Sequence, residues 1–212
     1  MKNNLLATLK ESEIRSYFTR KTYNKGTVIA SADEECKYLN VVNSGEISLQ
    51  TIFPSGHIVT IATLHKGDIF GEALIFASKN KYPITVFCSK DAEILSIDKR
   101  NILFLFNMNN RFLEMFLTMI SNKLLHLNSK IRILSQNSIR KKLCIYLIDE
   151  FNKTNSLTIK IPSSKEILAN VLNVPRPSLS RELMSMKDDK LTTYDKKTIT
   201  ILDIEKLEEE LF

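Results

Sequence analysis

The sequence predicts an α+β protein in three parts: an N-terminal β-roll of the double-stranded, jelly-roll-like kind, a long dimerisation helix and a C-terminal winged helix-turn-helix. Three observations support this fold class. Short β-branched runs separated by glycine-containing turns fill residues 27–98, a leucine-rich helical repeat follows, and two short amphipathic helices precede two strand-like runs near the C-terminal end. We expect the domain boundaries at 1–110, 111–136 and 137–212.

Composition places the chain among ordinary globular proteins. Hydrophobic residues make up 43% and charged residues 25% of the 212 positions, close to the average of folded domains. No apolar run approaches the ~18 residues of a membrane span, and the start lacks a secretory cleavage site. The three cysteines, Cys36, Cys88 and Cys144, form no CxxC pair, and an odd number favours a reducing compartment. These features predict a cytoplasmic protein, whereas the net charge of +6 alone indicates no particular partner.

The N-terminal segment predicts a helix and then a β-rich domain. Residues 1–22 are expected to form a short amphipathic helix. Six strand-like runs follow, at 27–29, 39–42, 46–49, 58–61, 84–87 and 93–97. Turn signals separate them, among them Asn43-Ser44-Gly45 and Lys66-Gly67-Asp68, and all five glycines of the chain fall in this segment. Many short strands with glycine turns are typical of a β-sandwich or β-roll.

The helical segment after residue 98 carries two apolar ridges. One follows alternating spacings of four and three residues, as in a heptad repeat: Leu113, Leu117, Ile120, Leu124, Leu127, Ile131 and Leu134. The other consists of Phe112, Phe116 and Met119. One ridge alone could be explained by packing on the β-roll. Two ridges are better explained by two partners, the β-roll and a symmetric copy of the helix, so we expect a homodimer.

Residues 137–212 predict a helix, a strand at 157–161 and then a helix-turn-helix with a wing. Ser163 and Glu166 form a capping box that opens the first helix of the motif, and Asn173 suits a left-handed bend after it. The second helix begins within residues 175–178, where proline is tolerated in the first turn. The runs at 191–193 and 198–202 are expected to form the wing.

The second helix of such a motif can place its first residues on base edges in the major groove of DNA. Here the residues at its start are Arg176, Ser178, Ser180 and Arg181, and arginine can donate to both acceptors of guanine. Four lysines are expected to meet phosphates: Lys165, Lys187, Lys196 and Lys197. A helical hairpin with ordinary solvated charges is the alternative for this segment.

Residues 66–73 of the β-rich domain, which include Gly71, Glu72 and Ala73, suit a small-ligand site. Backbone amides freed by glycine can bind an anion, and glutamate can accept hydrogen bonds from sugar hydroxyls. Tight turns of the roll are an equally good explanation. The three histidines form no metal motif, so haem or metal would depend on His57 or His126 alone. The catalytic signatures GxSxG, P-loop and GxGxxG are absent from the sequence, so we expect no enzyme.

Four segments occur in an order and spacing that resembles the Crp/Fnr transcription regulators: 25–29, 42–47, Gly67-Asp68-Ile69-Phe70-Gly71-Glu72, and Pro175-Arg176-Pro177-Ser178-Leu179-Ser180-Arg181. The resemblance spans nearly the whole chain. It implies a homodimer that binds a palindromic operator in double-stranded DNA, works with RNA polymerase and senses a small signal in the roll. The effector pocket that it implies consists of Gly71, Glu72, Ala73, Tyr82, Pro83, Ile84, Thr85, Lys123, Leu127 and Asn128.

This sequence departs from the family pattern at several positions. The Arg-Ser or Arg-Ala pair that holds the cyclic phosphate in cyclic-AMP-responsive members is Tyr82-Pro83 here. The hydroxyl residue expected to contact the base is Leu127, although the neighbouring Asn128 is polar. The glutamate that follows the first arginine of the recognition helix is Pro177, and the N-terminal cysteine cluster of the Fnr type is missing. We therefore expect an effector other than cyclic AMP and an operator that differs from the usual half-site.

These observations together predict a dimeric, sequence-specific DNA-binding transcription regulator without a defined cofactor and without a membrane partner, controlled by an unidentified small molecule. The alternative is a ligand-binding or haem/redox sensor module whose C-terminal domain mediates protein interaction. Arg176 and Arg181, with few acidic residues beside them, favour DNA over a protein partner.

Overall fold

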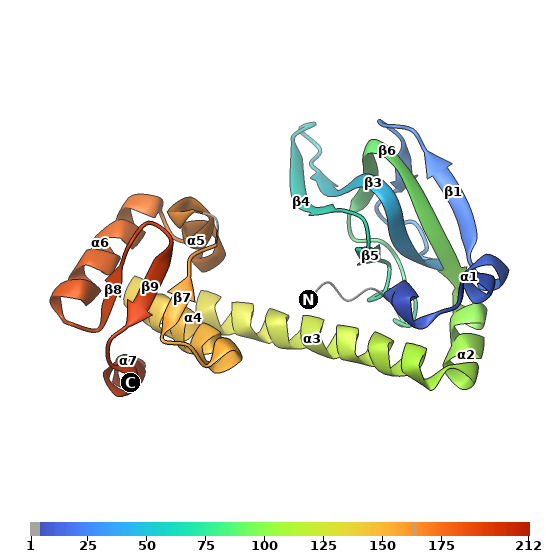
Figure 1. Ribbon diagram of the computed structural model, residues 1–212. Helices are drawn as coiled ribbons and strands as arrows, with labels where there is room; N and C mark the ends of the chain where they lie inside the picture. The colour runs from blue at the N-terminus through green and yellow to red at the C-terminus, as the bar shows by residue number, and fades with distance from the viewer. Residues whose placement is uncertain (1–4, 163) are drawn as a thin grey trace. The chain divides into compact units, whose positions relative to one another are not determined.

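The computed structural model describes residues 5–162 and 164–212 (Figure 1). The chain forms two compact units, Met1–Asn122 and Lys123–Phe212, and the division falls inside the long helix α3, Asn110–Leu134. In the part of the chain that the structure describes, no helix is long and apolar enough to cross a membrane.

The N-terminal unit is built on antiparallel strands. It begins with the 3₁₀ turn η1 (Leu5–Thr8) and the helix α1 (Glu11–Tyr17). The strands are β1 (Thr19–Tyr23), β2 (Val28–Ala30), β3 (Tyr38–Ile52), β4 (Ile58–Leu64), β5 (Ile69–Phe70) and β6 (Thr85–Asp98). They pair in the order β1-β6-β3-β4, with β2 also on β6 and β5 also on β3. Helix α2 (Lys99–Met108) leads into α3. This architecture confirms the predicted fold class for the first unit.

The helix predicted over residues 1–22 is wrong in its extent. Residues 1–4 lie outside the described residues, α1 covers only seven positions, and residues 19–23 form β1 instead. Strand β1 pairs with β6 from Thr19↔Ser96 to Tyr23↔Ala92. The paired residues lie 69 to 77 positions apart along the chain, so the local spacing of apolar residues does not reveal the partner strand.

The turn predicted at Asn43-Ser44-Gly45 is also wrong, because these residues continue the long strand β3. The pairing of β3 with β6 shifts register between Val42 and Ile47, which marks an irregularity of the β-bulge type. Gly45 has a φ of +86°, and a Cβ atom there would lie 2.2 Å from the carbonyl oxygen of Asp91 and 2.6 Å from Cα of Ala92. The glycine is therefore required by the close approach of two strands.

Replacing Gly45 with alanine is expected to destabilise the N-terminal unit more than replacing Gly56 does. Both residues have positive φ, but a Cβ at Gly56 meets nothing within 4 Å. The backbone strain is common to both variants, so the difference of about 1–3 kcal/mol reports the clash with the neighbouring strand. Urea unfolding followed by circular dichroism measures it. Equal losses of unfolding free energy in the two variants would contradict the close strand approach at Gly45.

The predicted second ridge of the long helix packs on the β-roll. Phe112, Phe116 and Met119 are buried in one cluster with β3 and β6 residues such as Leu39 and Ile97. Phe106 of α2 packs against Phe112 and Phe116 with tilted rings, whose centroids lie 5.6 and 5.2 Å from its own. One side of α3 therefore belongs to the core of the N-terminal unit, as the spacing predicts.

The C-terminal unit contains a helix-turn-helix and a small antiparallel sheet, as predicted. Its elements are α4 (Ile139–Thr154), β7 (Thr158–Lys160), α5 (Lys165–Leu172), α6 (Arg176–Asp188), β8 (Thr192–Tyr194), β9 (Thr198–Ile201) and α7 (Ile204–Glu209). The sheet order is β7-β9-β8, so the wing strands are joined by β7. Asn173 ends α5 with a φ of +51°, in the predicted left-handed conformation.

The cap of α5 differs from the prediction by one residue. Ser163 lies outside the described residues, and the structure gives Ser164 as the N-cap, whose side chain accepts a hydrogen bond from the Ile167 amide at 3.2 Å. Both serines are good N-cap residues, but only Ser163 has a glutamate three residues later, so the capping-box pattern favours Ser163 although Ser164 is the cap. Pro177 stands in the first turn of α6, as expected.

Candidate functional site

Helix α6 presents a defined outer face. Leu179 and Leu183 are fully buried beneath it together with Met186. At about 100° per residue, Arg181 lies roughly 200° around the helix from Leu179, on the side away from the core. Its side chain is exposed, as are those of Arg176 and Met184. The buried leucines therefore direct Arg181 outward.

The two serines of α6 lie differently from the two arginines. Ser178 and Ser180 are half-buried, and at about 100° per residue they stand on opposite flanks of the helix. Both hydroxyls therefore border the outer face and do not occupy its centre. Of the four residues expected at the start of α6, only the two arginines are fully available to a partner.

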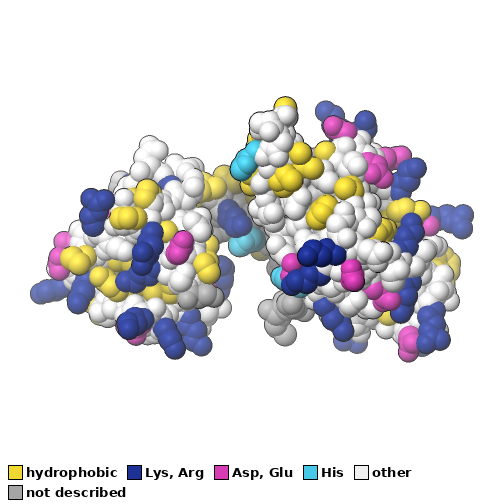
Figure 2. Space-filling view, turned by 90° about the horizontal axis from the view of Figure 1, so that it is seen from above, with side chains coloured by type: hydrophobic (Ala, Val, Ile, Leu, Met, Phe, Trp, Pro, Cys, Tyr) yellow, Lys and Arg dark blue, Asp and Glu magenta, His cyan; other side chains and the backbone are white. Residues whose placement is uncertain are grey.

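Three of the four predicted lysines lie on other elements, and Lys187 lies in the last turn of α6 itself. Lys165 at the start of α5 places its Nζ 4.2 Å from the ring centroid of Tyr194 on β8, so it helps to fix the wing. Lys187, Lys196 and Lys197 are exposed. Figure 2 shows Lys and Arg side chains more widespread than Asp and Glu on the face of the C-terminal unit that is turned to the viewer.

The wing turn between β8 and β9 is held by Asp195. Its Oδ1 accepts hydrogen bonds from the backbone amides of Lys197 at 2.6 Å and Thr198 at 2.7 Å, which lower the pKa of the carboxyl group. The turn therefore presents Lys196 and Lys197 on a fixed backbone.

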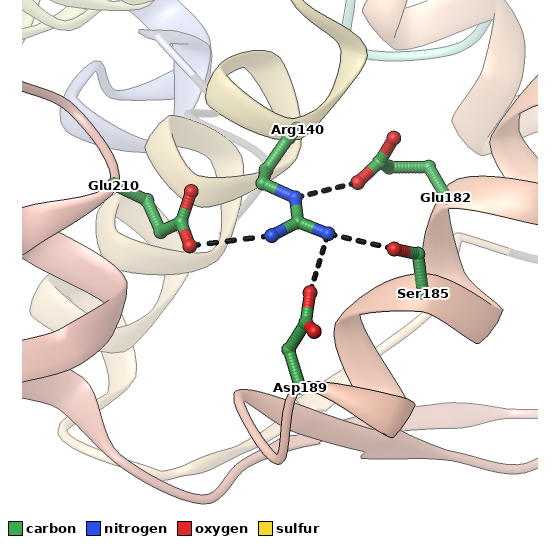
Figure 3. Close-up of polar contacts among 5 residues, drawn as sticks. All are labelled: Arg140, Glu182, Ser185, Asp189 and Glu210. Carbon is green, nitrogen blue, oxygen red and sulfur yellow. Dashed lines mark hydrogen bonds and ion pairs between the residues drawn. The ribbon is translucent and has the colours of Figure 1, made fainter.

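Arg140, at the start of α4, is a residue of this region that sequence reasoning missed. Figure 3 shows its guanidinium among side chains of α6 and of the residues that directly follow α6 and α7. Nε donates to Glu182 at 2.7 Å, Nη1 to Glu210 at 3.3 Å, and Nη2 to Asp189 at 2.6 Å and to Ser185 Oγ at 2.8 Å. The hydrogen bond with Glu182 is the main reason that the pKa of Arg140 is raised. These partners lie 42 to 70 residues away in sequence, so no local pattern connects them.

In the N-terminal unit, the predicted ligand segment 66–73 contains a tightly enclosed glycine, Gly71. Gly71 follows β5 with a φ of +85°, and a Cβ there would lie 2.6 Å from the Tyr38 carbonyl oxygen and 3.0 Å from Cys36 Sγ. The amides of Leu74 and Ile75 donate to the Gly71 carbonyl oxygen at 3.1 and 2.9 Å. Glu72 is half-buried and Ala73 exposed. Gly71 thus has a turn-forming role, and the half-buried Glu72 follows it directly.

Tyr82 lies inside the roll in a buried polar cluster. Its Oη lies 3.3 Å from Cys36 Sγ and 3.4 Å from Asn40 Nδ2, both of which are placed to donate to it. Asn40 Oδ1 in turn accepts a hydrogen bond from Ser96 Oγ at 2.7 Å. Burial raises the pKa values of the Tyr82 phenol and the Cys36 thiol, so both groups stay neutral. The Tyr82 hydroxyl is therefore neutral and already engaged with side chains inside the roll.

The remaining predicted pocket residues belong to two different units. In the first unit, Pro83 is exposed, Ile84 is half-buried and Thr85 is buried at the start of β6. Lys123, Leu127 and Asn128 lie on the part of α3 that belongs to the second unit, and their side chains are exposed there.

In the described part of the chain, most side chains of the heptad ridge of α3 are about half exposed. Leu113 and Ile120 are half-buried, and the other five members are exposed by about half: Leu117 54%, Leu124 57%, Leu127 54%, Ile131 56% and Leu134 49%. An open surface hollow of about 520 Å³ borders its first turns, lined by Leu113 and Leu117 among other α3 residues.

Histidine and cysteine side chains form no cluster in the described residues. No group of three His, Cys, Asp or Glu side chains there is arranged to hold a metal ion. His57 stacks on Phe53 at the β3–β4 hairpin, and His126 lies on α3, where desolvation, Lys130 and Lys153 lower its pKa. The three cysteines are free and buried.

Comparisons with known proteins agree with this arrangement. A cyclic nucleotide-binding domain model matches residues 20–109, and a Crp-like helix-turn-helix domain model matches residues 141–210. The chain is 24% identical to the anaerobic regulatory protein of Bacillus subtilis, over 89% of this chain and 82% of that protein. It is 27% identical to a probable transcriptional regulator, flp, of Lacticaseibacillus casei, over 87% and 84% of the two chains. The catabolite activator protein of Thermus thermophilus shares the fold, with a TM-score of 0.56, 21% identity and coverage of 99% and 98%.

Proposed function

Since this chain belongs to the Crp/Fnr family of transcription regulators, we propose that it acts as a homodimer in the cytoplasm, binds a palindromic operator through α6 and responds to a small molecule in the β-roll. We divide its roles among a sensor at 1–110, a dimerisation helix at 111–136 and a DNA-binding domain at 137–212. RNA polymerase is the proposed further partner, and no catalytic step is assigned.

The observation that carries the DNA-binding part is the outward position of Arg181 above a fully buried leucine stripe. An exposed arginine one turn into a recognition helix can donate to N7 and O6 of a guanine. Arg176, at the helix start, is the second candidate for base contact. The half-buried Ser178 and Ser180 are placed to contact the sugar-phosphate backbones that border the groove. Lys187, Lys196 and Lys197 are exposed and suit phosphates, which add affinity without sequence choice.

The uncovered heptad ridge of α3 supports the dimer. Five half-exposed leucine and isoleucine side chains in one a/d stripe form the surface that a parallel copy of the same helix covers in a coiled coil. A two-fold symmetric dimer matches a palindromic operator, with one recognition helix for each half-site. A ligand that changes how the two helices pack would alter the separation of the recognition helices, and this supplies the proposed control.

A salt-dependent DNA-binding measurement tests this function against the protein-docking alternative. We expect saturable binding to promoter fragments that weakens steeply between 50 and 200 mM salt, because displacement of counterions by Lys and Arg drives the phosphate contacts. A C-terminal domain that docks only onto proteins would bind no DNA at either salt concentration.

The residues of the roll do not fit a cyclic phosphate. Tyr82-Pro83 stands where cyclic-AMP-responsive members have an Arg-Ser or Arg-Ala pair, and the Tyr82 hydroxyl is already engaged with Cys36 and Asn40. The proposed effector is therefore a small molecule without a phosphate at this position, contacted by Glu72 from the segment after β5. Lys123, Leu127 and Asn128 of α3 are proposed as further contacts.

We expect no saturable binding of cyclic AMP to the purified protein at low micromolar concentrations. A charge-assisted arginine contact is among the strong interactions with a phosphate, and a neutral phenol does not replace it. Isothermal titration calorimetry of the full chain measures this directly. Sub-micromolar affinity would contradict the interpretation, and a parallel titration of Lys123→Ala would then show whether that lysine supplies the missing cation.

A further inference from the structure

We infer that Arg140 is a positioning residue for the recognition helix: its guanidinium sets the rotation of α6 about its own axis and so the direction in which Arg181 points. The inference rests on the proposed role of α6 in DNA binding. Arg140 itself would touch no nucleotide.

The contacts of Arg140 extend along one flank of α6. Glu182, Ser185 and Asp189 are separated by three and four residues, and all three accept hydrogen bonds from the same guanidinium. This spacing covers about two helical turns, or roughly 10 Å along the axis. A rigid planar group held at three points along a helix restrains both its tilt and its rotation. Nη1 adds Glu210, which follows α7, so the same group joins three helical segments (Figure 3).

The apolar core alone restrains the rotation of α6 about its axis less than the hydrogen bonds of Arg140 do. Leu179, Leu183 and Met186 form a buried stripe, but apolar packing has no preferred direction. The flank bound by Arg140 lies about 90° around the helix from that stripe, so it supplies a second, directional restraint. A rotation of about 20° would move a side-chain tip about 6 Å from the axis by about 2 Å, enough to break a hydrogen bond to a base edge.

The contacts of Arg140 also distinguish it from an arginine that binds DNA, because its donors are used within the protein. Its Nε and both terminal nitrogens already donate to side chains of the protein, and its side chain is only 23% exposed. Three carboxylates surround this one positive charge: Glu182, Asp189 and Glu210. A neutral residue at this position would leave them to repel one another on the flank of α6, although no phosphate contact would be lost.

The test compares full-length Arg140→Met and Arg140→Lys with Lys142→Met, which removes a positive charge from the same helix. Fluorescence anisotropy measures binding to the site that the unmodified protein selects from random DNA and to scrambled DNA, over a salt series. Each protein is measured below its own melting midpoint.

We expect Arg140→Met to lower the ratio of operator to scrambled affinity at least about tenfold with an unchanged salt slope. Arg140→Lys should restore part of the ratio, and Lys142→Met should keep it.

The same series contains the outcomes that overturn the inference. A folded Arg140→Met protein with the original ratio would reduce Arg140 to a structural residue. Equal losses on both DNAs with a shallower salt slope would make it a phosphate contact. If Arg140→Met fails to fold, Glu182→Gln replaces it in the test, because this variant keeps the shape of the side chain and removes one charged partner of Arg140. The inference requires Glu182→Gln to lower the ratio of operator to scrambled affinity. An unchanged ratio overturns the inference. Failure of the unmodified protein to select any sequence would refute the proposed function itself, and this inference with it.

Discussion

Replacing Leu124 with lysine in the full-length chain is expected to convert the dimer to monomers and to abolish operator binding. Leu124 lies in the middle of the heptad ridge of α3 and is 57% exposed within one chain. In a symmetric helix pair each residue of the seam faces its own copy, so the variant buries two like charges in an apolar layer. The cost is at least a few kcal/mol per dimer. Sedimentation velocity measures the loss.

Leu125→Lys is the matched control for this variant. Leu125 is 66% exposed on the same turn of α3 but lies outside the heptad ridge, so the same charge should leave the dimer intact. A tight dimer of Leu124→Lys would exclude the ridge as the interface. Dissociation of Leu125→Lys alone would place the interface on the neighbouring face.

Arg181→Ala is expected to remove sequence-specific binding while most of the weak, nonspecific binding stays. One bidentate contact with guanine discriminates against other bases by about 1–3 kcal/mol, and a dimer makes the contact at both half-sites. The expected loss on the operator is therefore about 2–6 kcal/mol, or at least roughly 30-fold in affinity. The side chain is exposed on the outer face of α6, so the substitution leaves the core unchanged.

Lys196→Ala is the comparison for Arg181→Ala. Lys196 is exposed in the wing turn held by Asp195 and is expected to meet only phosphate. Its removal should weaken operator and scrambled DNA alike and reduce the salt slope by about one unit. Both variants are measured on both DNAs. Proportionate losses for Arg181→Ala would make it a phosphate contact as well.

The parts of the fold that sequence predicts are those determined by local spacing. The two ridges of α3, the buried stripe of α6 and the left-handed Asn173 each follow from residues within a few turns of one another. In every case the apolar spacing or the backbone preference depends on residues close together in sequence, so it can be recognised without the rest of the fold.

The parts that sequence does not predict depend on partners far along the chain. Strand β1 forms because β6 pairs with it. Position 45 requires glycine because the backbone of β6 passes close to it. Arg140 looks like any surface arginine until the fold brings Glu182, Asp189 and Glu210 around it. The outward position of Arg181 is therefore predictable from the spacing within α6, whereas the contacts of Arg140 with residues far along the chain are not.

Selection of bound sequences from random double-stranded DNA by the purified, unmodified protein tests the central claim most directly. A two-fold dimer that reads DNA through α6 should enrich an inverted repeat whose half-sites are centred about one helical turn apart, or a multiple of it, near 10–10.5 base pairs. A guanine should stand at the position read by Arg181 in each half-site. Enrichment of a direct repeat, of a single half-site or of no sequence would contradict this account.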